Sequence, residues 1–545
     1  MDRPVSKTRF QRLLMPLICV VIIVGAVLRF DHVDQIYDEY DDVGVIAIQK
    51  VPLDSVKRDI NFGPIKSIQL DGSYLANIET TVWYGLFMGR VWTYSPGQYA
   101  LASLFLSDEM TARQRHIALR CLSGIVSVMT IVLLAFFLAR QSPGDSNERW
   151  LILPITALLS FSTNTILYSM HASPYSFYGF ALLAALVVAG RALEGRGRFY
   201  YACLALSVLC LFNYLVVLVL VSFLGIALFV STAHDRRNAI ADISNAPIPF
   251  LGRWLLVGMP LLVMVLLLKA DAGARGVAMP HVDSLGSLLK ALDVLQTQVR
   301  LVAFNTLYGG LPSRWMTSLL VLGGGIAAIL SLRSWILNRN YSALLTVSLL
   351  GGWGLLYILH KLPFDQSRHT LMLLPPFCLL LFWSMRPLVL RVPAFVMIAA
   401  SIAMTISISV AGYSNAKEAF GPRKAMLTKQ TIEKHAPDFV LTYGFTLGPI
   451  VDFYDSDVQA INLDLRSSLY FDWKAIDDSK RIMLVSQTKP MTETQLEGLR
   501  KRFPDLFENR NLVTISENST GVFFPFHSYP LSSNQNGAYI YHLSK

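Results

Sequence analysis

Residues 13–42 read LLMPLICVVIIVGAVLRFDHVDQIYDEYDD, an apolar run that ends in a cluster of acidic side chains. The apolar part, residues 13–28, holds no charged residue and is flanked by Arg12 and Arg29. Such a run favours a membrane-crossing helix, because the hydrocarbon interior offers backbone N–H and C=O groups no partner outside the segment. We expect an uncleaved first span rather than a signal peptide, because the chain downstream is also strongly apolar.

The composition of the whole chain is that of a membrane protein. Of its 545 residues, 53% are hydrophobic and 15% are charged, and the mean hydropathy is +0.46. Soluble domains carry about 25% charged residues. The net charge of +10 comes from Lys and Arg dispersed between apolar runs, which is typical of cytoplasmic loops and not of a nucleic-acid surface. The five cysteines lie in apolar runs without metal-binding spacing, so we expect neither disulfides nor a zinc site.

Several apolar runs are candidate spans, and one of them is long enough for two helices. The runs are 13–28, 121–139, 150–169, 172–190, 199–233, 254–268, 316–332, 341–359, 370–385 and 392–413. As one helix, 199–233 would be about 52 Å long, whereas a bilayer core is about 30 Å thick. We therefore expect a helical pair that turns near Asn213-Tyr214, which makes eleven spans.

The positions of the arginines support this pair. With the amino terminus in the cytoplasm, eleven spans place the arginine-bearing loops inside and leave the turns at 170–171 and 213–214 outside without Lys or Arg. A single span over 199–233 would reverse every later loop. The same topology places two long segments, 29–116 and 269–315, outside the membrane.

The composition changes sharply beyond Gly412. Phe439–Tyr443 and Arg481–Ser486 have the pattern of strands, and Glu493–Phe503 has that of a helix. The predicted fold class is therefore an α-helical polytopic membrane module over 1–413, followed over 414–545 by a soluble, extracytoplasmic α/β domain.

The acidic cluster, Asp38-Glu39-Tyr40-Asp41-Asp42, is the first candidate for chemistry. Carboxylates at a bilayer surface are costly and commonly functional, although a solvated loop end is an open alternative. The cluster directly follows a span and is flanked by aromatic residues, which favours a carboxylate that accepts a proton from an attacking hydroxyl. Two neighbouring aspartates are too little to predict a metal, so we expect no obligatory metal and no cofactor.

Five short motifs occur in order along residues 13–390. They are Tyr37-Asp38-Glu39-Tyr40, Tyr94-Ser95-Pro96-Gly97-Gln98-Tyr99, Arg115 to Arg140 ending in LAR, Tyr168-Ser169-Met170-His171-Ala172-Ser173-Pro174-Tyr175, and Gln366-Ser367-Arg368-His369 followed by Leu374-Pro375-Pro376. This ordered set resembles the GT-C glycosyltransferases that use polyprenyl-phosphate sugars, among them the protein mannosyltransferases, the aminoarabinose transferases of lipid A and the rhizobial galacturonosyltransferase type. The family has His where Tyr94 stands, and Glu and Arg where His171 and Ser173 stand. These departures leave the donor sugar open.

The resemblance implies an inverting transfer of one sugar. The acceptor hydroxyl would attack the anomeric carbon while Asp38 takes its proton, with Glu39 as the competing candidate. The lipid phosphate would leave on the opposite side, where its growing negative charge needs a cation. Arg368 is the best candidate for that role, because a guanidinium binds phosphate through paired hydrogen bonds. Lys361 and Arg300 are weaker candidates.

Further candidates for contact with the donor or acceptor are His171, Tyr175, Tyr94 and His369. Histidines on outer turns are more often solvated, and tyrosines at this depth are commonly interfacial anchors. The expected partners are a polyprenyl-phosphate-linked sugar, a lipid, glycan or protein acceptor, and membrane lipids. The resemblance implies transfer at the outer face of the cytoplasmic membrane by a multi-pass enzyme.

Two other classes of function stay open. A transporter or flippase of lipid-linked glycans would carry ionisable residues deep within its spans, and the apolar runs above hold none. A non-catalytic envelope assembly protein would tolerate the loss of the Asp38 and Glu39 carboxylates.

Overall fold

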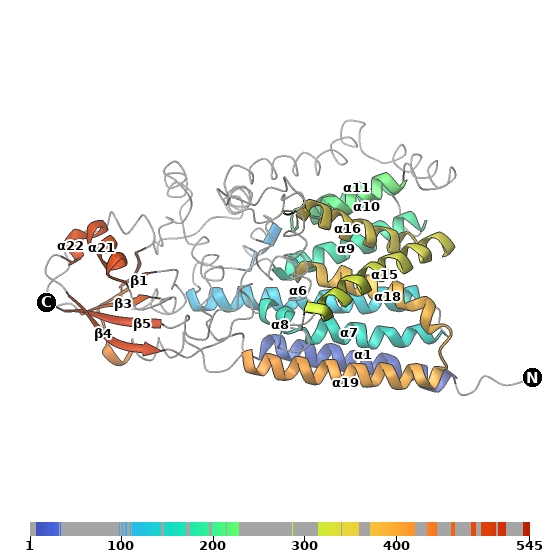
Figure 1. Ribbon diagram of the computed structural model, residues 1–545, viewed down its shortest axis with the longest axis horizontal. Helices are drawn as coiled ribbons and strands as arrows, with labels where there is room; N and C mark the ends of the chain where they lie inside the picture. The colour runs from blue at the N-terminus through green and yellow to red at the C-terminus, as the bar shows by residue number, and fades with distance from the viewer. Residues whose placement is uncertain are drawn as a thin grey trace, which may run out of the picture.

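The computed structural model describes a helical bundle and a carboxy-terminal sheet (Figure 1). The described residues are 7–31, 33, 97–98, 101, 104–105, 110, 112–142, 146–169, 175–195, 199–213, 215–227, 286, 314–338, 340–358, 371–419, 433–443, 459–463, 473, 481–486, 492–507, 511–518 and 538–544.

The bundle is built mainly from long apolar helices. Its helices are α1 (Lys7–Phe30), α6 (Ala112–Gln141), η1 (Asn147–Leu151), α7 (Ile152–Phe161), α8 (Thr163–Ser169), α9 (Tyr175–Leu193), α10 (Phe199–Cys210), α11 (Val216–Gly225), α15 (Arg314–Asn338), α16 (Tyr341–Ile358), η3 (Leu371–Leu373), α18 (Leu374–Val389) and α19 (Ala394–Ala419). In the part of the chain that is described, five helical segments are long and apolar enough to cross a membrane. They are 13–30, 117–141, 175–193, 371–389 and 394–414.

The long apolar run 199–233 is divided as the sequence predicts. Helix α10 ends at Cys210 and α11 begins at Val216, and the turn between them contains Asn213. The expected break near Asn213 is therefore confirmed. The predicted span 254–268 lies outside the described residues, so the count of eleven spans stays a prediction.

The run 150–169 differs from its prediction as a single helix. Helix α7 ends at Phe161, and Ser162 has an extended backbone with φ −60° and ψ 116° before α8 begins at Thr163. At this break Arg29 of α1 and Thr165 of α8 bind the carbonyl groups, and these contacts are described with the candidate site below.

Polar contacts define two ends of the bundle. At the first, called here the Arg29 end, Arg29 of α1 contacts α7 and α8. The second is called the Glu148 end, after the Glu148 of η1 that pairs with Arg386 of α18. At this end Ser342 of α16 also donates a hydrogen bond to Glu194, which accepts another from Gln141 of α6. Several arginines of the described helices and loops lie at the Glu148 end, namely Arg140, Arg149, Arg191, Arg333, Arg386 and Arg391.

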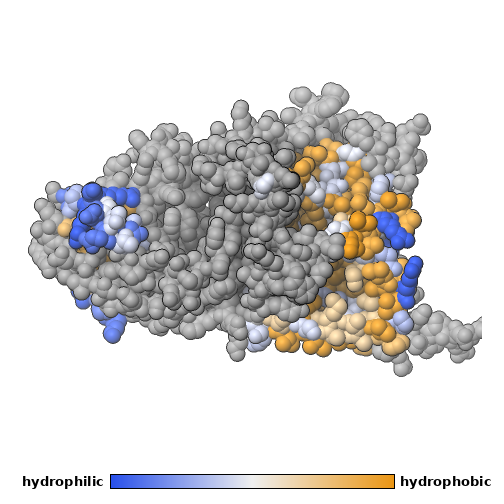
Figure 2. Space-filling model, in the orientation of Figure 1, coloured by the Kyte–Doolittle hydropathy of each residue, from blue (hydrophilic) through white to orange (hydrophobic). Residues whose placement is uncertain are grey.

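Close helix packing and an apolar outer surface fit a membrane environment. A Cβ atom on Gly25 of α1 would lie 2.8 Å from the Cβ of Ser160, and Gly412 of α19 approaches the Phe161 carbonyl, so α7 packs tightly against both helices. The outward side chains of α1 and α19 are apolar, and Val20 and Phe395 are 56% and 74% exposed. Figure 2 shows this apolar surface over the bundle, with hydrophilic side chains over the α21–α22 region.

The carboxy-terminal segment forms a five-stranded mixed sheet in the order β2-β1-β3-β5-β4. Its elements are β1 (Phe439–Tyr443), β2 (Gln459–Asn462), β3 (Ile482–Ser486), α21 (Glu493–Arg502), α22 (Pro504–Phe507), β4 (Asn511–Asn518) and β5 (Ala538–Ser544). Strand β1 pairs in parallel with β2 and β3, whereas β5 is antiparallel to β3 and β4. Strands β1 and β3 and helix α21 confirm the elements predicted at these positions.

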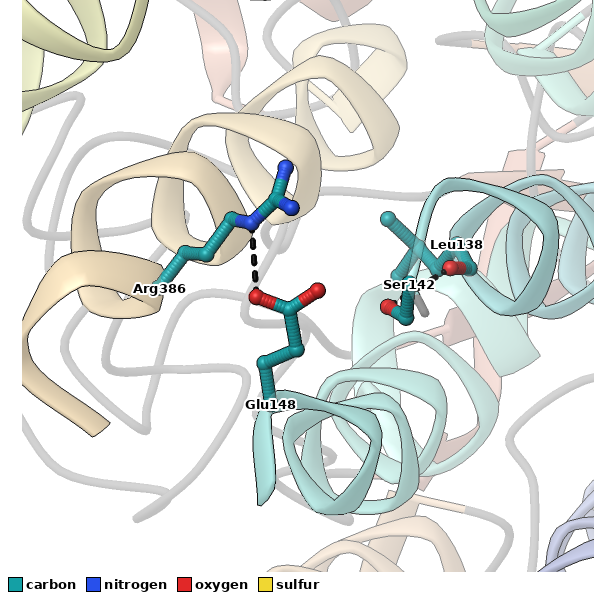
Figure 3. A network of polar contacts seen from close by, with 4 residues as sticks. All are labelled: Leu138, Ser142, Glu148 and Arg386. Atoms are coloured by element: carbon teal, nitrogen blue, oxygen red, sulfur yellow. Dashed lines mark hydrogen bonds and ion pairs between the residues drawn. The ribbon is translucent and has the colours of Figure 1, made fainter. Parts of the chain in front are cut away.

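A buried ion pair closes the Glu148 end (Figure 3). Glu148 of η1 is 1% exposed, and its Oε2 accepts a hydrogen bond from Nε of Arg386 in α18 at 2.6 Å. Asn147 donates a hydrogen bond to the Val392 carbonyl at 2.9 Å. These contacts attach η1 to the end of α18 and to the loop before α19.

We expect Arg386→Ala to destabilise the protein by about 3 kcal/mol, because the buried Glu148 carboxylate loses its counter-charge. Breaking a buried ion pair costs about 3–5 kcal/mol, and the 21% exposure of Arg386 places the effect at the low end of that range. Thermal unfolding in detergent measures it, with the exposed Arg333→Ala as the matched control. Unchanged unfolding of Arg386→Ala would contradict the role given to this pair.

Candidate functional site

The Arg29 end of the bundle is the candidate site, because the described segments beside the predicted residues meet there. Among the predicted residues, Tyr175 is described by the structure. The others lie outside the described residues; they are Asp38, Glu39, Tyr94, His171, Arg300, Lys361, Arg368 and His369. The site is therefore built from the segments that lead into and out of these positions.

Arg29 is the centre of this end, and its side chain is 1% exposed. Its guanidinium donates to the Oγ of Ser127 (2.8 Å), the carbonyls of Gly25 (2.7 Å), Ser160 (2.7 Å) and Leu159 (3.1 Å), and the Oγ1 of Thr165 (3.1 Å). These acceptors belong to α1, α6, α7 and α8. One buried side chain thus connects four helices.

The break at Ser162 explains why Arg29 finds carbonyl partners. The carbonyls of Leu159 and Ser160 would normally accept from the N–H groups four residues later, and the extended backbone at Ser162 removes those partners. Arg29 binds both carbonyls, and Thr165 Oγ1 donates a second bond to the Leu159 carbonyl at 3.0 Å. The carbonyls at the break are therefore satisfied by side chains, at a place where Ser160 and Ser162 are fully buried.

Three tyrosines continue the site from α8 to α9. Tyr168, Tyr175 and Tyr178 are 1%, 3% and 5% exposed. The Tyr175 ring packs edge-to-face against Tyr168 at 5.0 Å and against Tyr178 at 6.1 Å between centroids. Tyr175 is thus part of the packing between the two helices, and a contact between Tyr175 and a sugar stays a prediction.

Asn213 joins three segments at the turn between α10 and α11. It is fully buried, and its Nδ2 donates to the Tyr178 carbonyl at 3.1 Å and to Met372 Sδ at 3.5 Å. Its Oδ1 accepts from the backbone N–H of Leu215 at 2.9 Å, a local bond typical of Asn in turns. The turn, α9 and η3 are therefore held together by one amide.

The motif segment around Tyr94 is attached to the same turn. Gly97 donates its backbone N–H to the Leu211 carbonyl at 2.8 Å, and Gln98 is 2% exposed. A Cβ atom on Gly97 would lie 2.9 Å from both the Leu211 carbonyl oxygen and the Phe212 ring. Only glycine fits this approach without displacement of the backbone.

The chain leaving α1 has its own attachment. Arg120 of α6 is fully buried, and its Nη1 donates to the Val33 carbonyl at 3.1 Å. The backbone beyond α1 is thus held beside the start of α6 just before the acidic cluster begins.

Described residues that are close in sequence to the predicted residues share the Arg29 end. The described anchors are Val33 (five residues before Asp38), Gly97 (three after Tyr94), Tyr175 (four after His171), Ile358 (three before Lys361) and Met372 (four after Arg368 and three after His369). These described anchors lie at the Arg29 end of the bundle, and each is a near neighbour in sequence of a predicted residue; Arg300 has no such neighbour among the described residues.

Sequence reasoning missed Arg29, because an arginine at the end of an apolar run is most simply interpreted as a charged residue at the membrane surface. A signal was present in the hydroxyl residues Ser127, Ser160 and Thr165 inside apolar runs, where each needs a partner. Among the residues the structure describes, no group of three or more His, Cys, Asp or Glu side chains could hold a metal ion.

Comparisons with known proteins give structural neighbours alone. No protein-family model and no curated protein matches the sequence. The crystal structure of ArnT from Cupriavidus metallidurans in the apo state is similar over 97% of this chain and 98% of its own, with 11% identity and a TM-score of 0.49. The same protein bound to undecaprenyl phosphate is similar over 96% and 97%, with 12% identity and a TM-score of 0.33. ArnT is an aminoarabinose transferase of the GT-C class. Likeness at this level leaves the activity of the chain to be inferred from its own residues.

We expect Gly97→Ala to destabilise the protein by about 1–3 kcal/mol, because the added methyl group meets a backbone carbonyl that cannot give way freely. Gly354→Ala is the matched control, since a Cβ there would meet nothing within 4 Å. Thermal unfolding of the two variants in the same detergent checks the difference. Equal unfolding temperatures would show that the approach of Gly97 to Leu211 is not tight.

Proposed function

We propose that this protein is an integral-membrane, inverting glycosyltransferase. It moves a sugar from a polyprenyl-phosphate carrier to a lipid, glycan or protein acceptor at the outer face of the cytoplasmic membrane. The observation that carries this proposal is that Gly97 and Tyr175, which belong to two of the ordered motifs, and Met372, which directly precedes a third, make contacts at the same end of the helical bundle.

The reaction requires a base, a cation and two substrates in one place at the membrane surface. In the proposed step the acceptor hydroxyl attacks the anomeric carbon, Asp38 takes the hydroxyl proton, and the bond between that carbon and the phosphate oxygen breaks. The carrier phosphate leaves with the bonding electron pair, and Arg368 balances its charge. Attack opposite to the leaving group inverts the anomeric centre.

Charge and helix direction support the proposed location. The arginines at the Glu148 end support a cytoplasmic position for that end, which would put the Arg29 end outside. Helices α11 and α15 both run toward the Glu148 end, so one further crossing by 254–268 would complete eleven spans. Helix α19 ends at the Arg29 end, and the following sheet would then be extracytoplasmic and near the acceptor (Figure 1).

The decisive experiment uses Asp38→Asn. We expect it to lower transfer from a labelled polyprenyl-phosphate sugar by about 100-fold or more, because the amide cannot accept the proton. Purified wild-type and variant enzymes are compared in detergent, and mass spectrometry of envelope lipids and glycans from a deletion strain carrying each gene identifies the product. Asp41→Asn is the matched control, and we expect it to keep the wild-type activity.

The outcomes separate the proposed function from its alternatives. An active Asp38→Asn enzyme would overturn the base assignment and direct attention to Glu39. A wild-type protein that moves the lipid-linked sugar across vesicles without transferring it would be a flippase. A deletion strain with unchanged glycans, restored in growth by the variant, would indicate an assembly role.

Arg368→Ala should act on the donor. We expect the KM for the polyprenyl-phosphate sugar to rise by about tenfold, because one charge-assisted contact to phosphate is lost, while the KM for the acceptor changes little. Steady-state kinetics with each substrate varied in turn measures both constants. Equal effects on the two substrates would contradict a phosphate-binding role.

A further inference from the structure

We infer that Arg29 is a positioning residue for the proposed transfer reaction: it clamps the end of α1 to the break between α7 and α8 and so sets where two motif segments leave the bundle. This inference rests on the proposed function.

The hydrogen bonds of Arg29 are directed entirely into the protein. A guanidinium carries five N–H donors. Nε binds Ser127, Nη1 binds the carbonyls of Gly25 and Ser160, and Nη2 binds the Leu159 carbonyl and Thr165. With every donor used and 1% of the side chain exposed, Arg29 has nothing left to offer a lipid phosphate. Its role is therefore internal.

The acceptors place the clamp between two motif segments. On one side, α1 ends at Phe30, eight residues before Asp38. On the other side, the Leu159 and Ser160 carbonyls belong to the last turn of α7, and Thr165 belongs to α8, which ends two residues before His171. A change in the clamp would shift both segments relative to each other.

The chemistry of the acceptors explains why the residue is arginine. None of the five acceptors is a carboxylate, so burial of the charge is not offset by an ion pair within this set. Three acceptors are carbonyls in fixed directions, which suits a planar fork of donors. Lysine would offer three donors from one point and would leave part of this set unsatisfied.

A positioning role predicts a loss of kcat rather than of donor affinity. Displacement of reacting groups by about 1 Å can lower the rate by about 100-fold, although the groups themselves remain. Asp38 and Arg368 are both intact in an Arg29 variant. The donor should therefore bind nearly as well, and the transfer step should slow.

The experiment compares Arg29→Gln, Arg29→Lys and Ser127→Ala with Arg333→Gln as an exposed arginine control. We expect kcat to fall by about 100-fold in Arg29→Gln, about tenfold in Arg29→Lys and less in Ser127→Ala, with the donor KM changed by less than about twofold. Unfolding temperatures are measured in parallel, and kinetics are taken well below them. If Arg29→Gln does not fold, Arg29→Lys and Ser127→Ala still decide the question.

Chemical rescue separates positioning from simple stability. Millimolar guanidinium should restore part of the kcat of Arg29→Ala, because a small ion can supply the missing donors, and it should not raise the wild-type kcat. A folded Arg29→Gln enzyme with wild-type kcat would overturn the inference. A rise in donor KM with kcat unchanged would overturn it as well, because that would indicate contact with the phosphate.

Failure of the proposed function is distinguishable. If the wild-type enzyme transfers no sugar, hydrogen–deuterium exchange still tests the clamp without any activity. We expect Arg29→Gln to raise exchange at amides 163–169 and to leave amides 182–190 of α9 unchanged. If amides 163–169 exchange at the same rate in Arg29→Gln as in the wild type, Arg29 does not hold α8.

Discussion

Buried backbone groups must find hydrogen-bond partners within the protein, and this constraint governs the Arg29 end of the bundle. The break after α7 would otherwise leave buried carbonyls without partners. Arg29 fills that need by binding the Leu159 and Ser160 carbonyls while it also contacts α6 and α8. The break, the buried charge and the contact of four helices are therefore parts of one arrangement.

The same end is completed by contacts of a similar kind. Asn213 ties the α10–α11 turn to α9 and η3, and Gly97 lets another segment approach the backbone of that turn. Each contact joins segments far apart in the sequence through one polar group or one missing side chain. The opposite end is held by an ion pair between Glu148 and Arg386 at the junction of η1 and α18. The helices of the bundle are therefore connected by polar contacts at both of their ends.

Much of the architecture could be predicted because its causes are local. The division of 199–233 followed from the length of a bilayer-spanning helix and from the positions of arginines, and the structure confirms the turn at Asn213. Strand β1 and helix α21 followed from residue patterns over a few positions. The break at Ser162 was missed because 150–169 was interpreted as one apolar run, although residues 160–165 read SFSTNT and such hydroxyl and amide side chains favour turns and helix ends. That Arg29 would bind the carbonyls at this break could not be predicted, because it depends on the packing of α1 against α7. The packing of the Tyr175 ring against Tyr168 and Tyr178 also depends on the tertiary structure, and its predicted contact with substrate stays a prediction.

Apolar runs by themselves determined where membrane-crossing helices are expected and that the composition changes beyond Gly412. These properties depend on the transfer of short segments between water and hydrocarbon, and each segment carries that information in its own composition. The partners of Arg29 were decided only by the tertiary structure, because the acceptors lie up to 136 residues away along the chain. A guanidinium at the end of an apolar run can bind water, lipid phosphate or buried carbonyls, and only the packing of α6, α7 and α8 around it selects the last of these.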